Sequence, residues 1–209
     1  MPNSEGPPSF SAVNEFKKKA QAVSTETVEV KGLGGALDYL LKVAKEASPA
    51  SLLPVSGAEF PKASNRAEPR KKLIAAPGLT DADFDRLDKK ASELGFGLIR
   101  KGLRDFVSGF EVAFSVAAFG VAETATCVLE NESEDARLAG MLAETHVVAL
   151  DKKRLFETSR DALGLLEAAL NRPANFVSFI SGPSRTSDIE RVLTLGVHGP
   201  FHFHVALMD

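Results

Sequence analysis

The sequence contains a single cysteine, Cys127, among its 209 residues. One thiol cannot form an internal disulfide, and it cannot supply the four ligands of a self-contained iron–sulfur or zinc site. Cys127 lies in an apolar run, where a small side chain suits a core strand, and no basic neighbour in the sequence favours a thiolate. We therefore expect a structural cysteine, and neither a metal nor a cofactor in this chain.

The sequence also lacks a long apolar run and a large net charge. No stretch approaches the roughly 20 apolar residues of a membrane-spanning helix, and Met1–Ser9 lack the apolar core of a signal peptide. The net charge of −3 argues against a general surface for nucleic acid or anionic membranes. These features predict a cytoplasmic protein with no membrane span and no nucleic-acid partner.

The remaining pattern predicts one domain over residues 10–209, after a disordered tail at 1–9. A polar segment with two prolines predicts a flexible loop near 56–70. Elsewhere strand and helix patterns alternate, which favours an α/β fold with a mainly parallel sheet sandwiched by helices. Thr80 and Ser133 have the character of helix N-caps. The predicted helices are 10–23, 32–47, 80–95, 133–142, 158–170 and 187–195, and the predicted strands are 27–30, 51–55, 73–76, 97–99, 118–122, 126–129, 145–150, 176–180 and 203–208.

The segment Ser181–Glu190 carries the strongest functional signal. It connects an apolar strand to the start of a predicted helix, where free N–H groups and the helix dipole attract anions. Ser184 and Thr186 offer hydroxyl groups, and Arg185 offers a guanidinium that suits a carboxylate or a phosphate. The alternative is that Arg185 pairs with Asp188 and only braces the loop.

Glu123, Thr124 and His198 are further candidates for a pocket. Glu123 and Thr124 interrupt an apolar hairpin, and polar groups within a core need partners, although a hairpin tip facing water would explain them equally. His198 lies in a glycine-rich turn, where its imidazole is either a ligand contact or bonded to the backbone.

The other histidines have simpler explanations. His202 and His204 alternate on the last predicted strand and would form its polar face, with no nearby carboxylate except Asp209. His146 falls inside a predicted strand, where we expect it to be buried or half-buried. No metal site is predicted.

Three segments resemble the LutC/YkgG family of lactate-utilization (LUD) domain proteins. The run ISGPSRTSDIERVLTLGVHGP, residues 180–200, resembles the family's hallmark, and FGVAETATCVLEN, residues 119–131, resembles its A-E-T-G-T segment, with Ala125 at the glycine position. The run RLAGMLAETHVVAL resembles the family's arginine-led helix and the following strand that carries a histidine. The resemblance covers Phe119–Met208, about half of the chain.

The resemblance implies a fold of the NagB/RpiA/CoA-transferase-like type and a role in a bacterial system that oxidises L-lactate to pyruvate. In that system the partner subunits carry iron–sulfur clusters, which this chain would not hold itself. Two alternatives remain: a stand-alone enzyme on a phosphorylated metabolite, as among fold relatives such as sugar-phosphate isomerases and folate cyclo-ligases, or a scaffold for the iron–sulfur subunits. The expected pocket for a small carboxylate or phosphorylated metabolite comprises Glu123, Thr124, Ser184, Arg185, Thr186 and His198.

Overall fold

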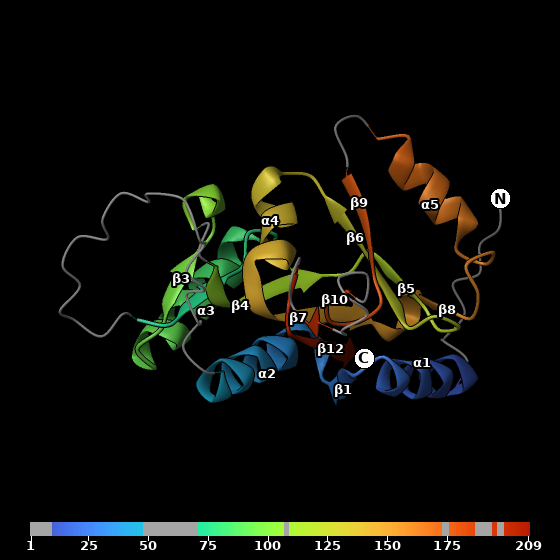
Figure 1. Cartoon of the computed structure of the whole chain (residues 1–209), viewed down its shortest axis with the longest axis horizontal. Helices are drawn as coiled ribbons and strands as arrows, with labels where there is room; N and C mark the ends of the chain where they lie inside the picture. Colours follow the sequence, from blue (N-terminus) through green and yellow to red (C-terminus); the bar gives the residue numbers. More distant parts are fainter. Residues whose placement is uncertain (1–9, 48–70, 107–108, 173–175, 187–193, 196–198) are drawn as a thin grey trace.

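The computed structural model describes residues 10–47, 71–106, 109–172, 176–186, 194–195 and 199–209. Its centre is a six-stranded sheet in which all the paired strands are parallel, in the order β1-β12-β7-β4-β2-β3 (Figure 1). The tail at 1–9, the loop near 56–70 and the strand predicted at 51–55 lie outside the described residues. The strands of this sheet are β1 (Thr25–Val30), β2 (Leu73–Ala75), β3 (Gly97–Ile99), β4 (Phe110–Val116), β7 (Ala143–Asp151) and β12 (His202–Met208).

Helices pack on both faces of the six-stranded sheet. One face carries α2 (Gly32–Glu46) and α3 (Asp81–Glu93), whose apolar stripes bury side chains such as Leu40 and Leu87 against the sheet. The other face carries α1 (Phe10–Ala22) and α4 (Glu134–Leu142). The prediction of an α/β fold with a mainly parallel sheet flanked by helices is confirmed.

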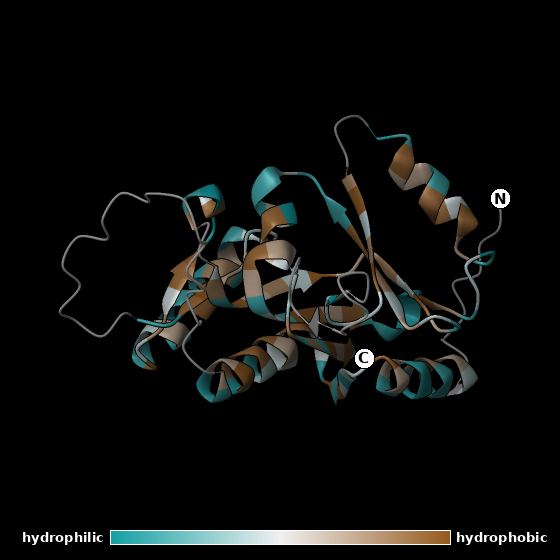
Figure 2. Ribbon diagram, in the orientation of Figure 1, coloured by the Kyte–Doolittle hydropathy of each residue, from teal (hydrophilic) through white to brown (hydrophobic). Residues whose placement is uncertain are grey.

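A second, four-stranded sheet of order β8-β5-β6-β9 packs on the α1 face of the first. Its outer face is covered by α5 (Leu163–Leu170), which lies beside β9 (Figure 1). The strands of the six-stranded sheet are mostly apolar, whereas α1, α2 and α3 carry many hydrophilic residues (Figure 2). Helix α5 is mostly apolar, and Leu163 and Leu170 on it are exposed. The strands are β5 (Phe119–Val121), β6 (Thr126–Asn131), β8 (Leu155–Phe156) and β9 (Phe176–Ile180).

The β5–β6 hairpin has the tight turn predicted from the sequence. Its strands are antiparallel, and Ala125 in the turn has a φ of 51°, in the left-handed region that glycine adopts most readily. Ala125 is nevertheless fully buried in the core beside Cys127. The left-handed turn is therefore kept without glycine, and the alanine methyl group fills core space.

Two helix caps and the lone cysteine are as expected. Thr80 accepts a hydrogen bond from the Asp83 N–H at 3.2 Å, and Ser133 accepts one from the Ala136 N–H at 3.1 Å. Cys127 is fully buried, and burial raises the pKa of its thiol to about 12. Cys127 is a core residue, as its apolar context predicted.

The structure differs from the sequence prediction most clearly in three segments. Phe110–Val116 is a central strand that was not predicted from the sequence, because its apolar residues continue into those at 117–119 and no turn residue marks where the strand ends. The helix predicted from residue 158 begins only at Leu163. The helix prediction is wrong at Thr194–Leu195, which forms β11 and pairs antiparallel with β10 (Arg185–Thr186); residues 187–193 lie outside the described part.

Candidate functional site

The loop that follows β9 docks on the turn between α1 and β1. Gly182 has a φ of 144°, and a Cβ atom added to it would lie 2.9 Å from the Val23 carbonyl oxygen. Arg185 is exposed, and its Nη2 donates a hydrogen bond to Ser24 Oγ at 2.7 Å. The structure thus gives Arg185 a bracing contact with the turn, whereas Asp188, the brace considered above, lies outside the described residues.

A cavity of about 270 Å³ opens between α4, β9 and this loop, and is called here the α4–β9 cavity. Ser184 lines it, and Arg185 does not. The cavity is mostly apolar, with a few polar side chains at defined places, which is typical of small-ligand sites. Its lining residues are Leu129, Asn131, Ala136, Arg137, Gly140, Met141, Phe176, Ser178, Ile180, Gly182, Ser184, Gly199 and Pro200.

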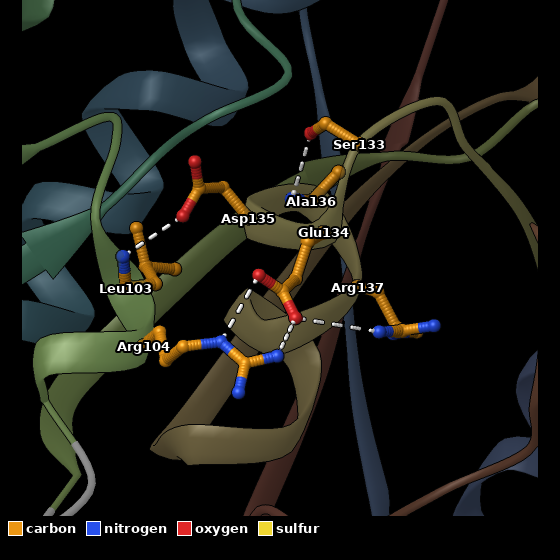
Figure 3. A network of polar contacts seen from close by, with 7 residues as sticks. All are labelled: Leu103, Arg104, Ser133, Glu134, Asp135, Ala136 and Arg137. Carbon is orange, nitrogen blue, oxygen red and sulfur yellow. Dashed lines mark hydrogen bonds and ion pairs between the residues drawn. The ribbon is translucent and has the colours of Figure 1, made fainter.

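Arg137 is the only charged side chain among these lining residues. Its guanidinium carbon lies 5.2 Å from the centre of the Phe176 ring, within the range of a cation–π contact. Its Nη2 lies 3.7 Å from Glu134 Oε1, as part of the polar network at the start of α4 (Figure 3). The cavity therefore has a positive group over an aromatic wall.

Hydrogen bonds from Asn131 organise the β9 wall of the cavity. Asn131 Nδ2 donates to the Phe176 carbonyl oxygen at 3.1 Å and to Ser178 Oγ at 2.8 Å. Because the Ser178 oxygen is the acceptor in this bond, its O–H can still donate to a ligand in the cavity. The wall thus combines an apolar ring with an oriented hydroxyl group.

The structure places Glu123 and Thr124 away from the α4–β9 cavity. Both the N–H and the hydroxyl of Ser159 donate to Glu123 Oε1 at 2.7 Å, and these bonds lower the pKa of the exposed Glu123 carboxyl. Thr124 lines a smaller cavity of about 50 Å³ on the α5 side of the four-stranded sheet. Thr126 also lines this smaller cavity, and its Oγ1 lies 2.7 Å from Thr124 Oγ1 and 2.6 Å from the Oγ of Ser181, in the loop after β9.

The six predicted pocket residues are therefore not gathered in one described cavity. Ser184 lines the α4–β9 cavity and Thr124 the smaller one. Thr186 belongs to β10, next to Arg185, while His198 lies outside the described residues.

His146 is buried on β7, directly behind α4. Its Nε2 lies 2.9 Å from Ser115 Oγ, and its buried Nδ1 has no hydrogen-bond partner among the described residues. A Cβ atom added to Gly140 would lie 3.2 Å from Nδ1, so the glycine allows α4 to approach the imidazole. Burial lowers the pKa of His146 to about 4, which keeps the ring neutral at physiological pH.

The other two described histidines differ in burial. His202 is exposed, whereas His204 is buried, with its Nδ1 3.1 Å from the Tyr39 hydroxyl oxygen. Burial lowers the pKa of His204. Within the described ranges, no three His, Cys, Asp or Glu side chains are grouped so that they could hold a metal ion.

Sequence reasoning missed Arg137 and Phe176 as site residues. In the sequence Arg137 only opens the run that resembles the family's arginine-led helix, and Phe176 only begins a predicted strand. Phe176 is 51% exposed at the start of β9, which is an edge strand of the four-stranded sheet. The signal that could have identified Arg137 is its place as an arginine on α4, the helix that precedes the buried strand β7. Nothing in the sequence showed that β9, which carries Phe176, lies beside α4.

Comparison with known proteins identifies the family. The family model of the LUD domain matches residues 13–208. Lactate utilization protein C of Exiguobacterium sp. is 29% identical over 68% of this chain and 60% of its own length, and lactate utilization protein C 1 of Bacillus mycoides is 31% identical over 50% and 46%. The chain thus spans less than two thirds of these relatives.

A solved structure supports the same fold. The crystal structure of a DUF162 family protein from Deinococcus radiodurans at 1.70 Å resolution superposes with a TM-score of 0.60 over 100% of both chains, at 14% identity. None of the helices in the described ranges has the length and apolar character needed to cross a membrane. Since the family model covers nearly all of the sequence, the chain belongs to the LUD domain family.

Proposed function

We propose that this chain is the LutC-like component of a bacterial lactate-utilization system, and that its α4–β9 cavity binds a small monocarboxylate such as lactate or pyruvate. The relatives named lactate utilization protein C support the role in lactate utilization. The position of Arg137 supports the ligand class, and it is the observation on which the proposal rests.

The lining of the cavity favours a short monocarboxylate over a phosphorylated metabolite. A single guanidinium can bind one carboxylate through two parallel hydrogen bonds, with the Phe176 ring and Met141 beside the apolar part of the acid. A phosphate dianion would leave a second negative charge without a cation among the described lining residues, and unpaired charge in a mostly apolar site is costly. The cavity volume of about 270 Å³ is just below the usual range for pockets that bind drug-sized ligands, about 300–1,000 Å³, which suits a small acid.

In this proposal the chain binds and orients the acid, and partner subunits transfer the electrons. Its single cysteine cannot supply the thiolates of an iron–sulfur cluster. Cys127 is moreover fully buried, with its thiol pKa raised to about 12, so it is no accessible thiolate ligand. The clusters would therefore belong to cysteine-rich partner proteins.

Replacement of Arg137 by alanine tests the carboxylate site. We expect the affinity for lactate and pyruvate, measured by isothermal titration calorimetry, to fall by about 10- to 100-fold, because a hydrogen bond to a charged group contributes about 1.5–3 kcal/mol. Arg172→Ala is the matched control, since Arg172 pairs with Glu130 and does not line the cavity. Equal loss in both variants, or tighter binding of a sugar phosphate than of lactate, would contradict the proposal, and the second result would favour the stand-alone enzyme.

Affinity capture tests the proposed partners. The tagged chain, expressed in a bacterium grown on lactate, is expected to co-purify proteins with C-x-x-C motifs and the visible absorbance of iron–sulfur clusters. Arg137→Ala should retain these partners, because the proposed role of Arg137 is limited to the ligand. Purification of the chain without iron–sulfur proteins, from cells that demonstrably oxidise lactate, would refute the assembly.

A further inference from the structure

We propose that Arg104 is a positioning residue for the α4–β9 cavity: it holds the Glu134 carboxylate and so leaves the charge of Arg137 available for a bound acid. This inference rests on the proposed carboxylate site. Arg104 lies in the 3₁₀-helix η1 (Leu103–Asp105) and Glu134 in the first turn of α4 (Figure 3). Arg104 is not among the lining residues of the cavity, so its effect on a ligand would act through Glu134.

Glu134 lies between two arginines and contacts them unequally. Arg104 Nε donates to Glu134 Oε2 at 3.2 Å, and Arg104 Nη2 donates to Oε1, so both carboxylate oxygens are bound in a two-pronged contact. Arg137 lies 3.7 Å from Oε1 alone, beyond hydrogen-bond distance. The hydrogen bond from Arg104 is also the largest of the causes that lower the pKa of the Glu134 carboxyl.

The position of Arg104 is fixed by its neighbours. Leu103 is fully buried, and its N–H donates to Asp135 Oδ1 at 2.8 Å, which attaches η1 to the first turn of α4. Ser133 caps the same turn (Figure 3). The backbone of Arg104 is therefore held opposite the first turn of α4 by the burial of Leu103 and by a hydrogen bond to Asp135, neither of which involves the charges of Arg104 and Glu134.

This arrangement sets a competition for Arg137. Glu134 and a bound carboxylate are both negative, and either can pair with the guanidinium. While Arg104 binds Glu134, the guanidinium of Arg137 stays over Phe176, at the cavity. Without Arg104, Glu134 would be free to close the distance to Arg137 and neutralise it.

The test is a double-mutant cycle on ligand affinity. Because an ion pair exposed to solvent is weak, Arg104→Ala is expected to weaken lactate binding by no more than about 5-fold, and Glu134→Gln to strengthen it by a similar factor. In the Arg104→Ala/Glu134→Gln double variant, the loss caused by removing Arg104 should disappear, because no carboxylate remains to compete. Glu130→Gln is the control, since Glu130 is bound by Arg172 and does not line the cavity; its affinity should not change.

The outcomes separate this inference from the proposed function. If Arg137→Ala weakens binding but Arg104→Ala and Glu134→Gln do not change it, the Arg104–Glu134 pair only joins η1 to α4, and the inference fails while the carboxylate site stands. If Arg104→Ala weakens binding equally with and without Glu134, Arg104 does not act through Glu134, and the inference also fails. If Arg137→Ala has no effect, the carboxylate site itself is refuted. Urea unfolding midpoints of all variants show whether a loss of affinity reflects loss of fold.

Discussion

Replacement of Gly182 by alanine is expected to lower the free energy of unfolding by about 2–4 kcal/mol. Two effects combine at this position. A φ of 144° is a conformation that L-residues rarely adopt, and the new methyl group would lie 2.9 Å from the Val23 carbonyl oxygen and 3.2 Å from Thr25 Oγ1. Because these neighbours are a backbone atom and a buried side chain, they cannot move without disturbing the turn between α1 and β1. A urea titration should show a lower midpoint at unchanged m-value.

Gly164→Ala provides the matched control for this substitution. Gly164 lies in α5, and a Cβ atom added to it would meet nothing within 4 Å. Alanine is the better helix former by about 1 kcal/mol, so this variant should be as stable as the unmodified protein or more so. A Gly182→Ala protein with an unchanged midpoint would show that the loop after β9 does not dock on the α1–β1 turn.

The protein is expected to lose about 3 kcal/mol of stability between pH 6.5 and pH 4 because of His146 alone. The unfolded chain binds a proton at His146 with the usual pKa of 6.5, whereas burial holds the folded-state pKa at about 4. Within this window the unfolded state therefore binds more protons, and the free energy of unfolding falls as the pH falls, by about 1.4 kcal/mol for each pH unit of the shift. Above pH 6.5 the ring is neutral in both states, and its contribution is fully present.

The His146→Asn variant isolates this contribution. Asparagine keeps a polar group near Ser115 but does not titrate, so the slope of stability against pH between 6.5 and 4 should become shallower. The remaining slope includes His204, whose pKa burial also lowers. Glu29, whose pKa is lowered to about 2 by its bonds to Lys17 and Lys152, affects stability only below about pH 4.5. The measurement is urea unfolding at several pH values from 7 to 4, and identical slopes for the two proteins would disprove the assignment.

Local sequence signals predicted most of the elements of the fold. The four helices α1, α2, α3 and α4 carry regular apolar spacing, and Thr80 and Ser133 cap the last two of them as expected. The central strand β4 was missed, because Phe114 and Val116 are followed directly by the apolar residues 117–119 and no turn residue separates this strand from the next. The presence of a second sheet also escaped prediction, since strand pairing depends on contacts between distant segments.

The candidate site was less predictable than the fold. The loop after β9 was singled out from the sequence, and one of its residues, Ser184, lines the α4–β9 cavity. Its neighbour Arg185 contacts Ser24, more than 150 residues earlier in the sequence, and no local pattern could reveal that partner. The cation of the cavity comes instead from α4, because the fold brings Arg137 over the ring of Phe176. Local sequence patterns identify side chains that could bind an anion. Which of these side chains lie in one cavity is decided by the packing of distant helices and strands.

The position of β12 has a consequence for how the chain reaches its native state. This strand, His202–Met208, is inserted between β1 and β7, so β1 obtains its hydrogen-bonded neighbour in the sheet only from residues near the other end of the sequence. During synthesis β1 therefore stays unpaired in this sheet until the ribosome has produced residues beyond 200. Closing so long a loop is slow, and the growing chain exposes an incomplete sheet edge in the meantime.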